Sequence, residues 1–212
     1  MLHDRDIREP LFEYLEAEYG KVRILEEKAM GRSRADIVMV TEDALVGIEI
    51  KSDADTYTRL PRQVRDYDRY FDRNILVAGV SHMQHVEEHL PPWWGIITAE
   101  ALEDGTLDFY IARRPGPNPN VEDERKMSIL WRRELNHLLE RNGMPRYAEK
   151  SKKFVAAALL ERVAPDDLAW QISEELFERD YNTISEDINA YREAHRQKPR
   201  ARGGRKKRKR RN

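Results

Sequence analysis

Two short apolar runs rich in β-branched residues lie close together in the first quarter of the chain. They are Ile37–Thr41 and Ala44–Ile50, and only the acidic dipeptide Glu42-Asp43 separates them. Apolar runs of this length are typical of β-strands, and a two-residue acidic connection suits a tight loop. The pattern therefore predicts a β-hairpin over residues 37–50.

The register of this hairpin follows from its loop. If the two residues between the runs form the loop, Thr41 pairs with Ala44, and counting outward places Asp36 opposite Glu49. Side chains alternate along a strand, so Lys51 lies on the same face as Glu49. Two facing carboxylates repel each other unless a cation lies between them or one is protonated. The register predicts a site where two acids and a lysine meet and where a hard divalent cation would bind.

Helical and strand patterns alternate over the rest of the first 114 residues. Leu60, Val64, Tyr67 and Phe71 recur at helical spacing, and Pro61 suits the first turn of that helix. This order of elements predicts an α/β core with a mixed sheet flanked by helices. The other predicted elements are helices at Asp4–Tyr19 and, after a Ser81 N-cap, His82–His89, and strands at Val22–Glu26, Asn74–Val80, Gly95–Ala99 and Leu107–Ile111.

The second half of the chain reads differently. Residues 115–120, PGPNPN, cannot hold regular structure and are interpreted as a linker. The apolar spacing after them is helical over Val121–Arg141, Lys152–Val163 and Pro165–Arg179, and more weakly over Ile184–His195. We therefore expect an α/β core at 1–114, a linker at 115–120, a small all-α domain at 121–197 and a basic tail at 198–212.

Charge is unevenly distributed along the chain. The 212 residues carry a net charge of −1, yet residues 198–212 contain ten of the 38 Lys and Arg and no acid. Residues 1–197 thus hold 28 basic and 39 acidic residues, a net charge of −11. A basic tail without an apolar face predicts disorder in the free protein and binding to phosphates, with a merely solvated charge run as the alternative.

Several classes of protein are excluded by what the sequence lacks. Without cysteine there are no disulfides, cysteine nucleophiles or cysteine metal sites. GxSxG and P-loop motifs are absent, which argues against serine hydrolases and ordinary NTPases. No signal peptide and no apolar run of roughly 20 residues is present, so we expect a cytoplasmic protein without a membrane span.

The spacing Asp36…Glu49-Ile50-Lys51 on a hairpin resembles the PD-(D/E)xK nuclease superfamily, although Ala35 stands where the superfamily name has proline. This resemblance implies that Asp36, Glu49 and the Ile50 carbonyl hold Mg²⁺ or Mn²⁺. It also implies that Lys51 assists the attacking water.

The helix after the hairpin extends the resemblance. Gln63 and Tyr67 are four residues apart on one side of that helix, and they match the QxxxY motif of RecB-like nucleases. The run EIKSDADTYTRLPRQVRDY, followed by LPPWWGI at Leu90–Ile96, also resembles a small, poorly characterised prokaryotic family assigned to this superfamily. The resemblance covers about the first 115 residues, and it implies that Gln63 and Tyr67 orient Lys51 or the nucleic-acid backbone.

Nucleases of this superfamily often add an acid from the first helix to the metal site. Pro10 is tolerated if it lies in the first turn of that helix, which would place Glu9 at the helix start. By analogy Glu9 is the favoured additional ligand, with Glu13 and Glu27 as competitors. The alternative interpretation is a solvated acid on a charged helix.

Two other motifs have competing interpretations. The segment His85-Val86-Glu87-Glu88-His89 matches the HxxEH zinc pattern of inverzincin peptidases, but its predicted helix is short and lacks a third ligand. Solvated surface histidines are the favoured interpretation. In Trp93-Trp94 one ring would fill the core, which leaves at most one to stack on a base.

These observations predict a Mg²⁺- or Mn²⁺-dependent nuclease acting on DNA, or alternatively RNA, with Asp36, Glu49, Lys51, Gln63 and Tyr67 in the active site. The alternative function is a nucleic-acid-binding module with a nuclease-like core and no turnover. Strand preference, endo- or exonucleolytic cutting and oligomeric state are left open. The candidate nucleic-acid-binding residues are Arg34 and, in the tail, Arg205, Lys206, Lys207, Arg208, Lys209, Arg210 and Arg211.

Overall fold

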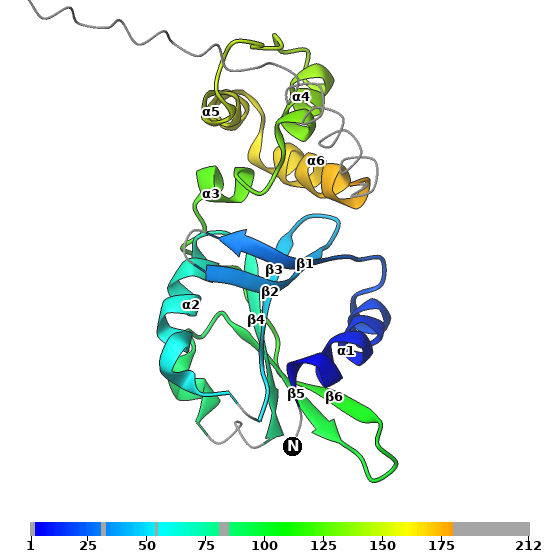
Figure 1. The fold of residues 1–212 in the computed structure, drawn as a ribbon. Coiled ribbons are helices and arrows are strands. Elements are labelled where there is room, and N and C mark those ends of the chain that lie inside the picture. The colour runs from blue at the N-terminus through cyan, green and yellow to red at the C-terminus, as the bar shows by residue number, and fades with distance from the viewer. Residues whose placement is uncertain (1–2, 31–32, 54, 81–84, 180–212) are drawn as a thin grey trace, which may run out of the picture. The chain divides into compact units, whose positions relative to one another are not determined.

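Six strands form one mixed sheet in this computed structural model, which describes residues 3–30, 33–53, 55–80 and 85–179. The strands lie in chain order across the sheet (Figure 1). The pairs β1–β2, β2–β3 and β5–β6 are antiparallel, whereas β3–β4 and β4–β5 are parallel. The sheet confirms the predicted α/β architecture. Its strands are β1 Arg23–Met30, β2 Ser33–Val40, β3 Leu45–Lys51, β4 Arg73–Gly79, β5 Gly95–Ala101 and β6 Leu107–Arg113.

The sheet is followed by helices, as predicted, although one helix was expected where two exist. Val121–Arg141 is not continuous, because the chain leaves the helix at Ser128 and a new helix begins at Arg132. The backbone N–H of Trp131 donates to Glu134 Oε2 at 2.6 Å and so caps the second helix. Ile129 and Leu130, in the connection between the two helices, are both buried. The helices are α1 Asp4–Tyr19, α2 Leu60–Asp68, α3 Asp123–Met127, α4 Arg132–Arg141, α5 Lys152–Arg162 and α6 Pro165–Phe177, with 3₁₀ turns η1 Tyr57–Arg59 and η3 Val86–His89.

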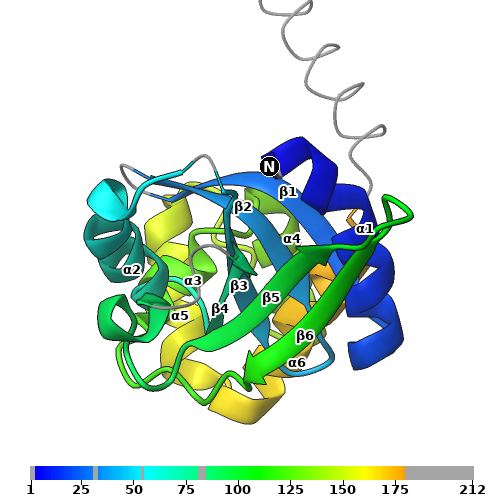
Figure 2. The same ribbon diagram turned by 90° about the horizontal axis from the view of Figure 1, so that it is seen from below.

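Helices cover both faces of the sheet (Figure 2). Ile37 and Met39 of β2 pack in a core with α1, whereas Val38 and Val40 pack in a second core with α2 and the C-terminal helices. Because side chains alternate along a strand, Asp36 points to the same face as Val38 and Val40. The strand period therefore turns this carboxylate toward α2.

The helix α1 has the predicted bounds, but Pro10 does not lie in its first turn. It starts at Asp4 and ends at Tyr19, where Gly20 adopts a φ of 75°. Pro10 consequently lies inside the helix and not in its first turn, so the expectation that Glu9 stands at the helix start is wrong. Ile7, Leu11 and Leu15 of α1 are buried against the sheet.

Residues 115–120 have no regular structure but are held firmly against the core. Asn118 is 6% exposed, and its side-chain amide donates to the carbonyls of Asp68 and Phe71 at 2.7 Å each. The backbone N–H of Gly116 donates to the Trp93 carbonyl at 2.9 Å. Residues 1–177 form one compact unit, and the division into domains at this segment stays a proposal.

Some predictions concern residues outside the described part of the chain. These are the helix at Ile184–His195, the tail at 198–212 and the start of the short helix at Ser81 and His82. The described end of that short helix is the 3₁₀ turn Val86–His89. None of the helices in the described ranges is both long enough and apolar enough to span a lipid bilayer.

Candidate active site

The hairpin has the register that its loop predicts. Ile37 pairs with Ile48, and the backbone N–H of Thr41 donates to the Ala44 carbonyl at 3.0 Å. One step beyond the last ladder pair, Asp36 lies opposite Glu49. The two carboxylates thus come from neighbouring strands at the open end of the hairpin.

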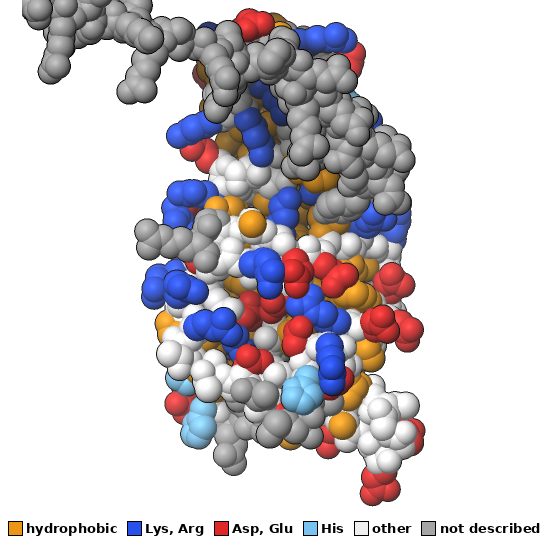
Figure 3. Space-filling view, viewed as in Figure 1, with side chains coloured by type: hydrophobic (Ala, Val, Ile, Leu, Met, Phe, Trp, Pro, Cys, Tyr) orange, Lys and Arg blue, Asp and Glu red, His pale blue; other side chains and the backbone are white. Residues whose placement is uncertain are grey.

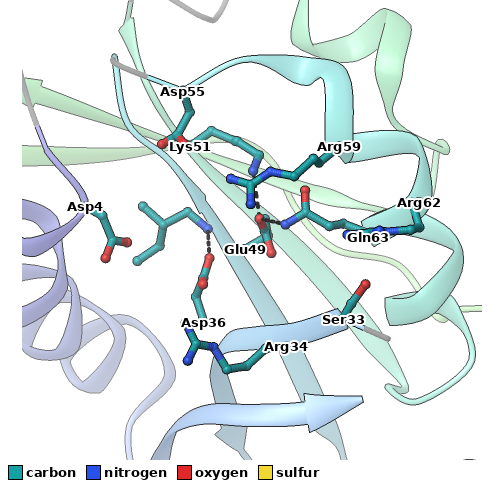
Figure 4. Close-up of a pocket in the computed structure, with 11 residues that line it drawn as sticks. Asp4, Ser33, Arg34, Asp36, Glu49, Lys51, Asp55, Arg59, Arg62 and Gln63 are labelled. Carbon is teal, nitrogen blue, oxygen red and sulfur yellow. Dashed lines mark hydrogen bonds and ion pairs between the residues drawn. The ribbon is translucent and has the colours of Figure 1, made fainter. Parts of the chain in front are cut away.

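A polar pocket of about 310 Å³ lies at this end of the hairpin (Figure 4). Ile50, Ser33 and Gln63 contribute to its wall together with charged side chains of both signs. The cations in the wall are Arg34, Lys51, Arg59 and Arg62. The acids are Asp36, Glu49, Asp4 and Asp55. The structure thus brings Asp36, Glu49, Lys51 and Gln63 to one cavity, with Tyr67 directly behind it.

Three side chains hold the carboxylate of Glu49, which is only 2% exposed. Lys51 Nζ donates to Glu49 Oε1 at 2.8 Å, and Gln63 Nε2 donates to the same oxygen. The Tyr67 hydroxyl donates to Glu49 Oε2 at 2.8 Å. Gln63 and Tyr67 face the strand together because they are one helical turn apart on α2. The expectation was that they orient Lys51 or the nucleic-acid backbone, whereas here each donates a hydrogen bond to Glu49.

The hydroxyl of Tyr67 also joins the two strands of the hairpin. It accepts a hydrogen bond from the Asp36 backbone N–H at 3.2 Å and lies 3.1 Å from the Ile48 carbonyl oxygen. Burial, followed by the negative charge of Glu49, raises the pKa of Tyr67 well above its ordinary value. The phenol therefore stays protonated and keeps its ability to donate.

Asp36 is oriented by the backbone and by a cation from α1. The Ile50 N–H donates to Asp36 Oδ2 at 3.0 Å, and Arg8 Nη2 lies 3.7 Å from Oδ1. Burial, followed by the nearby Glu49 charge, raises the pKa of Asp36 from 3.8 to about 7. Without a bound cation, this pair of carboxylates is therefore electrostatically strained at neutral pH.

The raised pKa makes the stability of the metal-free protein depend on pH. The folded state keeps the Asp36 proton up to about pH 7, whereas the unfolded chain releases it near 3.8. The folded state binds more protons in between, so its stability falls as pH rises through that window and levels off above it. We expect Asp36→Asn to remove this loss, which is at most about 4 kcal/mol.

Urea unfolding in chelator at about pH 5 and pH 8 measures this effect. The stability gained by Asp36→Asn over the wild type should be larger at the higher pH. An equal difference at both values would contradict the raised pKa.

Gly47 lets α2 approach the strand that carries Glu49. A Cβ atom at this position would overlap the Phe71 ring and come within 2.7 Å of Tyr67 Cδ1. Gly47→Ala is therefore expected to displace α2 and to destabilise the protein by about 1–3 kcal/mol. Thermal unfolding measures it, with Gly116→Ala as the control because its nearest neighbour would lie at an ordinary 3.7 Å. Equal unfolding temperatures for the two variants would show that Gly47 is not needed for packing.

The structure does not bring Glu9 to the pocket. Glu9 is exposed on α1, and Asp4 of the same helix lines the cavity instead. Glu13 is also exposed and absent from the lining. Glu27, on β1, is ion-paired with Arg34 at 2.7 Å. Glu9 therefore stays without a structural connection to Asp36 or Glu49.

The donor set fits a magnesium ion. Among the described residues, no group of three or more His, Cys, Asp or Glu side chains is placed to hold a metal. Mg²⁺ commonly uses only one or two carboxylates and completes its octahedron with water and substrate phosphate. Asp36 and Glu49 meet that requirement. Gln63 Oε1 is buried without a hydrogen-bond partner in the described ranges, which suits a water molecule held beside these carboxylates.

The histidine and tryptophan motifs have structural explanations. His85 precedes the 3₁₀ turn that contains His89, and the His89 ring packs on Tyr57 with centroids 4.6 Å apart. Trp94 is fully buried, and its indole N–H donates to Asp68 Oδ1 at 2.8 Å. The half-buried Trp93 donates to the same oxygen at 3.2 Å. Both tryptophans thus belong to the core network around Asp68.

Comparison with known proteins places the chain in a family. The family model described as bacteriophage P4 protein cII matches residues 2–201. The chain belongs to this family. No curated protein matches it. Among solved structures, it is similar to one described as the structure of Pyrococcus furiosus SfsA in complex with Ca²⁺, at 14% identity and a TM-score of 0.31. That match covers 53% of this chain and 60% of the SfsA chain, less than two thirds of its length.

Sequence reasoning missed several residues of the pocket. Arg59 and Arg62 line it, and Arg59 lies four residues before Gln63, a spacing that indicates a shared helix side. A glycine inside a strand, as at Gly47, is a recognised sign of close backbone approach. Arg34, a predicted nucleic-acid-binding residue, lines the pocket. The predicted nucleic-acid-binding residues of the tail lie outside the described residues.

Proposed function

We propose that the protein is a metal-dependent nuclease of the PD-(D/E)xK type that hydrolyses phosphodiester bonds in DNA. The observation that supports this most strongly is the convergence of Asp36, Glu49 and Lys51 on one polar pocket that also contains arginines. Carboxylates suit a divalent cation and guanidinium groups suit phosphate, so the pocket has the two kinds of group that phosphodiester hydrolysis needs.

In this proposal Asp36, Glu49 and the Ile50 carbonyl hold Mg²⁺ or Mn²⁺. When bound there, the ion would polarise a phosphate oxygen and lower the pKa of bound water. Asp36 reaches the pocket with its Oδ2 atom fixed by the Ile50 N–H. Glu49 is fixed by Gln63 and Tyr67, which act as positioning residues.

Lys51 has a separate role from the carboxylates. Its ammonium group is 2.8 Å from Glu49 Oε1 and is almost fully buried at the back of the pocket. A fixed positive charge at that place would orient the attacking water and offset the negative charge that develops on the phosphate. Because the charge is already in position, no reorganisation is needed at the moment of reaction.

Contact with nucleic acid involves charges beyond the pocket. The body of the chain has a net charge of −11 over residues 1–197, which repels a polyanion at long range. We propose that the tail residues 205–211 supply the attraction and that Arg34 contacts the backbone beside the pocket.

A cleavage assay tests the proposed function. The purified full chain is incubated with double-stranded DNA, single-stranded DNA and single-stranded RNA, in Mg²⁺ or Mn²⁺ and in chelator. We expect the metal-containing samples to cut DNA, the chelated sample to be inactive, and excess Mg²⁺ to restore it. Cutting that persists in chelator, or no cutting of any substrate, would contradict the proposal.

A second candidate is a binding module with this pocket but no turnover. The ion pair between Lys51 and Glu49 favours it, because the lysine already compensates one carboxylate without a metal. Binding of nucleic acid by the wild type, with no cutting in either metal, would establish this alternative.

A further inference from the structure

Two arginines of the pocket have no part in the metal site proposed above. Arg59 ends η1 and Arg62 lies in the first turn of α2, and both side chains are exposed at the pocket wall. The segment that leaves β3 at Lys51 thus returns past the carboxylates within eight residues. Figure 4 shows both arginines on the α2 side of the pocket and Arg34 on the β2 side.

Among the described residues, Arg59 and Arg62 differ from the other cations of the pocket in having no acidic partner. Lys51 pairs with Glu49 at 2.8 Å, and Arg34 pairs with Glu27 at 2.7 Å. Within the described ranges, the side chains of Arg59 and Arg62 form neither a hydrogen bond nor an ion pair. An exposed guanidinium offers a planar fork of donors that matches the oxygens of a phosphate.

The chemistry of the pocket favours a sugar-phosphate backbone over a base. Its described lining is charged or polar apart from Ile50 and contains no aromatic side chain on which a base could stack. Phosphate contacts position a nucleic acid and carry no direct sequence information. A cavity of about 310 Å³ with this lining has room for a backbone segment.

The distribution of charge around the pocket indicates the side on which a nucleic-acid strand would leave it. Figure 3 shows Lys and Arg side chains along the α2 side of this face, whereas Asp and Glu gather toward the α1 side with a few Lys and Arg among them. A polyanion that enters the pocket is repelled on the α1 side and attracted on the α2 side. The strand would therefore leave the pocket along α2, past Arg59 and Arg62.

We propose that Arg59 and Arg62 bind the phosphates next to the scissile one, so that the protein holds its substrate through the backbone, independently of base sequence. The position of these contacts next to a scissile phosphate rests on the proposed nuclease function. The binding contact itself does not, because it forms without a metal and without cleavage.

Binding in chelator tests this inference separately from catalysis. The full chain is titrated against two short fluorescent duplexes of unrelated sequence over a series of NaCl concentrations. Arg59→Ala and Arg62→Ala are compared with Arg65→Ala, whose side chain is exposed on the same helix but does not line the pocket. Each pocket variant should reduce the slope of log affinity against log salt by about 0.9, one phosphate contact, on both duplexes.

The outcomes separate the two hypotheses. Slopes for Arg59→Ala and Arg62→Ala that equal those of the wild type and of Arg65→Ala would overturn the inference. Weakening on only one of the two sequences would overturn its claim of backbone recognition. Reduced slopes in a protein that cuts nothing in Mg²⁺ would support these contacts while contradicting the nuclease proposal. Arg59→Lys should recover most of the slope, because it restores the positive charge.

Discussion

Replacing Asp36 by asparagine is expected to lower the single-turnover rate of DNA cleavage in Mg²⁺ by at least about a thousandfold. The substitution removes the negative charge that the cation requires. It keeps an oxygen that can accept the hydrogen bond from the Ile50 N–H, so the hairpin should stay folded. The measurement is the cleavage of labelled DNA by excess enzyme.

Asp43→Asn is the matched control for this prediction. It makes the same chemical change on the same hairpin, in the exposed loop at the opposite end from the pocket. We expect this variant to cut at the wild-type rate. If Asp36→Asn cleaved DNA at a rate close to that of Asp43→Asn, Asp36 would not be an active-site residue.

Replacing Lys51 by alanine is expected to reduce cleavage by about a hundredfold to a thousandfold, because it removes a preorganised charge from the reacting phosphate. Lys51 is 2% exposed and pairs with a buried carboxylate. Leaving Glu49 without that partner would also destabilise the fold by about 3–5 kcal/mol. Activity and thermal unfolding must therefore be measured on the same samples.

A second variant separates chemistry from folding. Lys51→Arg keeps the charge next to Glu49 and should unfold closer to the wild-type temperature, yet the larger guanidinium is misplaced for the attacking water. We expect it to be folded and slow. Lys153→Ala, on the exposed side of α5, is the control for loss of a lysine. A folded Lys51→Arg variant with full activity, together with an active Lys51→Ala variant, would mean that Lys51 takes no part in the chemistry.

The hairpin could be predicted from the sequence because two independent features determine it, the length of its loop and the strand period. A two-residue loop allows one register, and the strand period of two then assigns Asp36 and Glu49 to one face. The helix break between Ser128 and Trp131 could not be predicted, since the apolar spacing continues through it. The new helix starts where the Trp131 N–H donates to Glu134 Oε2, and the apolar spacing does not indicate this contact.

The sequence also predicted some of the side chains that line the pocket. The resemblance to the QxxxY motif indicated Gln63 and Tyr67, but their shared partner, Glu49, depends on how closely α2 packs on β3. Glu9 was favoured by analogy with the superfamily, on the condition that Pro10 lies in the first turn of α1. That condition fails, because the helix begins at Asp4 as predicted, and Asp4 lines the pocket instead.

A crystal structure of the full chain grown or soaked in Mn²⁺ tests the central claim most directly, because anomalous scattering locates the ion without reference to activity. The proposal predicts an anomalous peak between Asp36 and Glu49, within about 2.3 Å of an oxygen of each, together with the Ile50 carbonyl and water. No peak at that place in saturating Mn²⁺, or a peak at His85 and His89 instead, would contradict it.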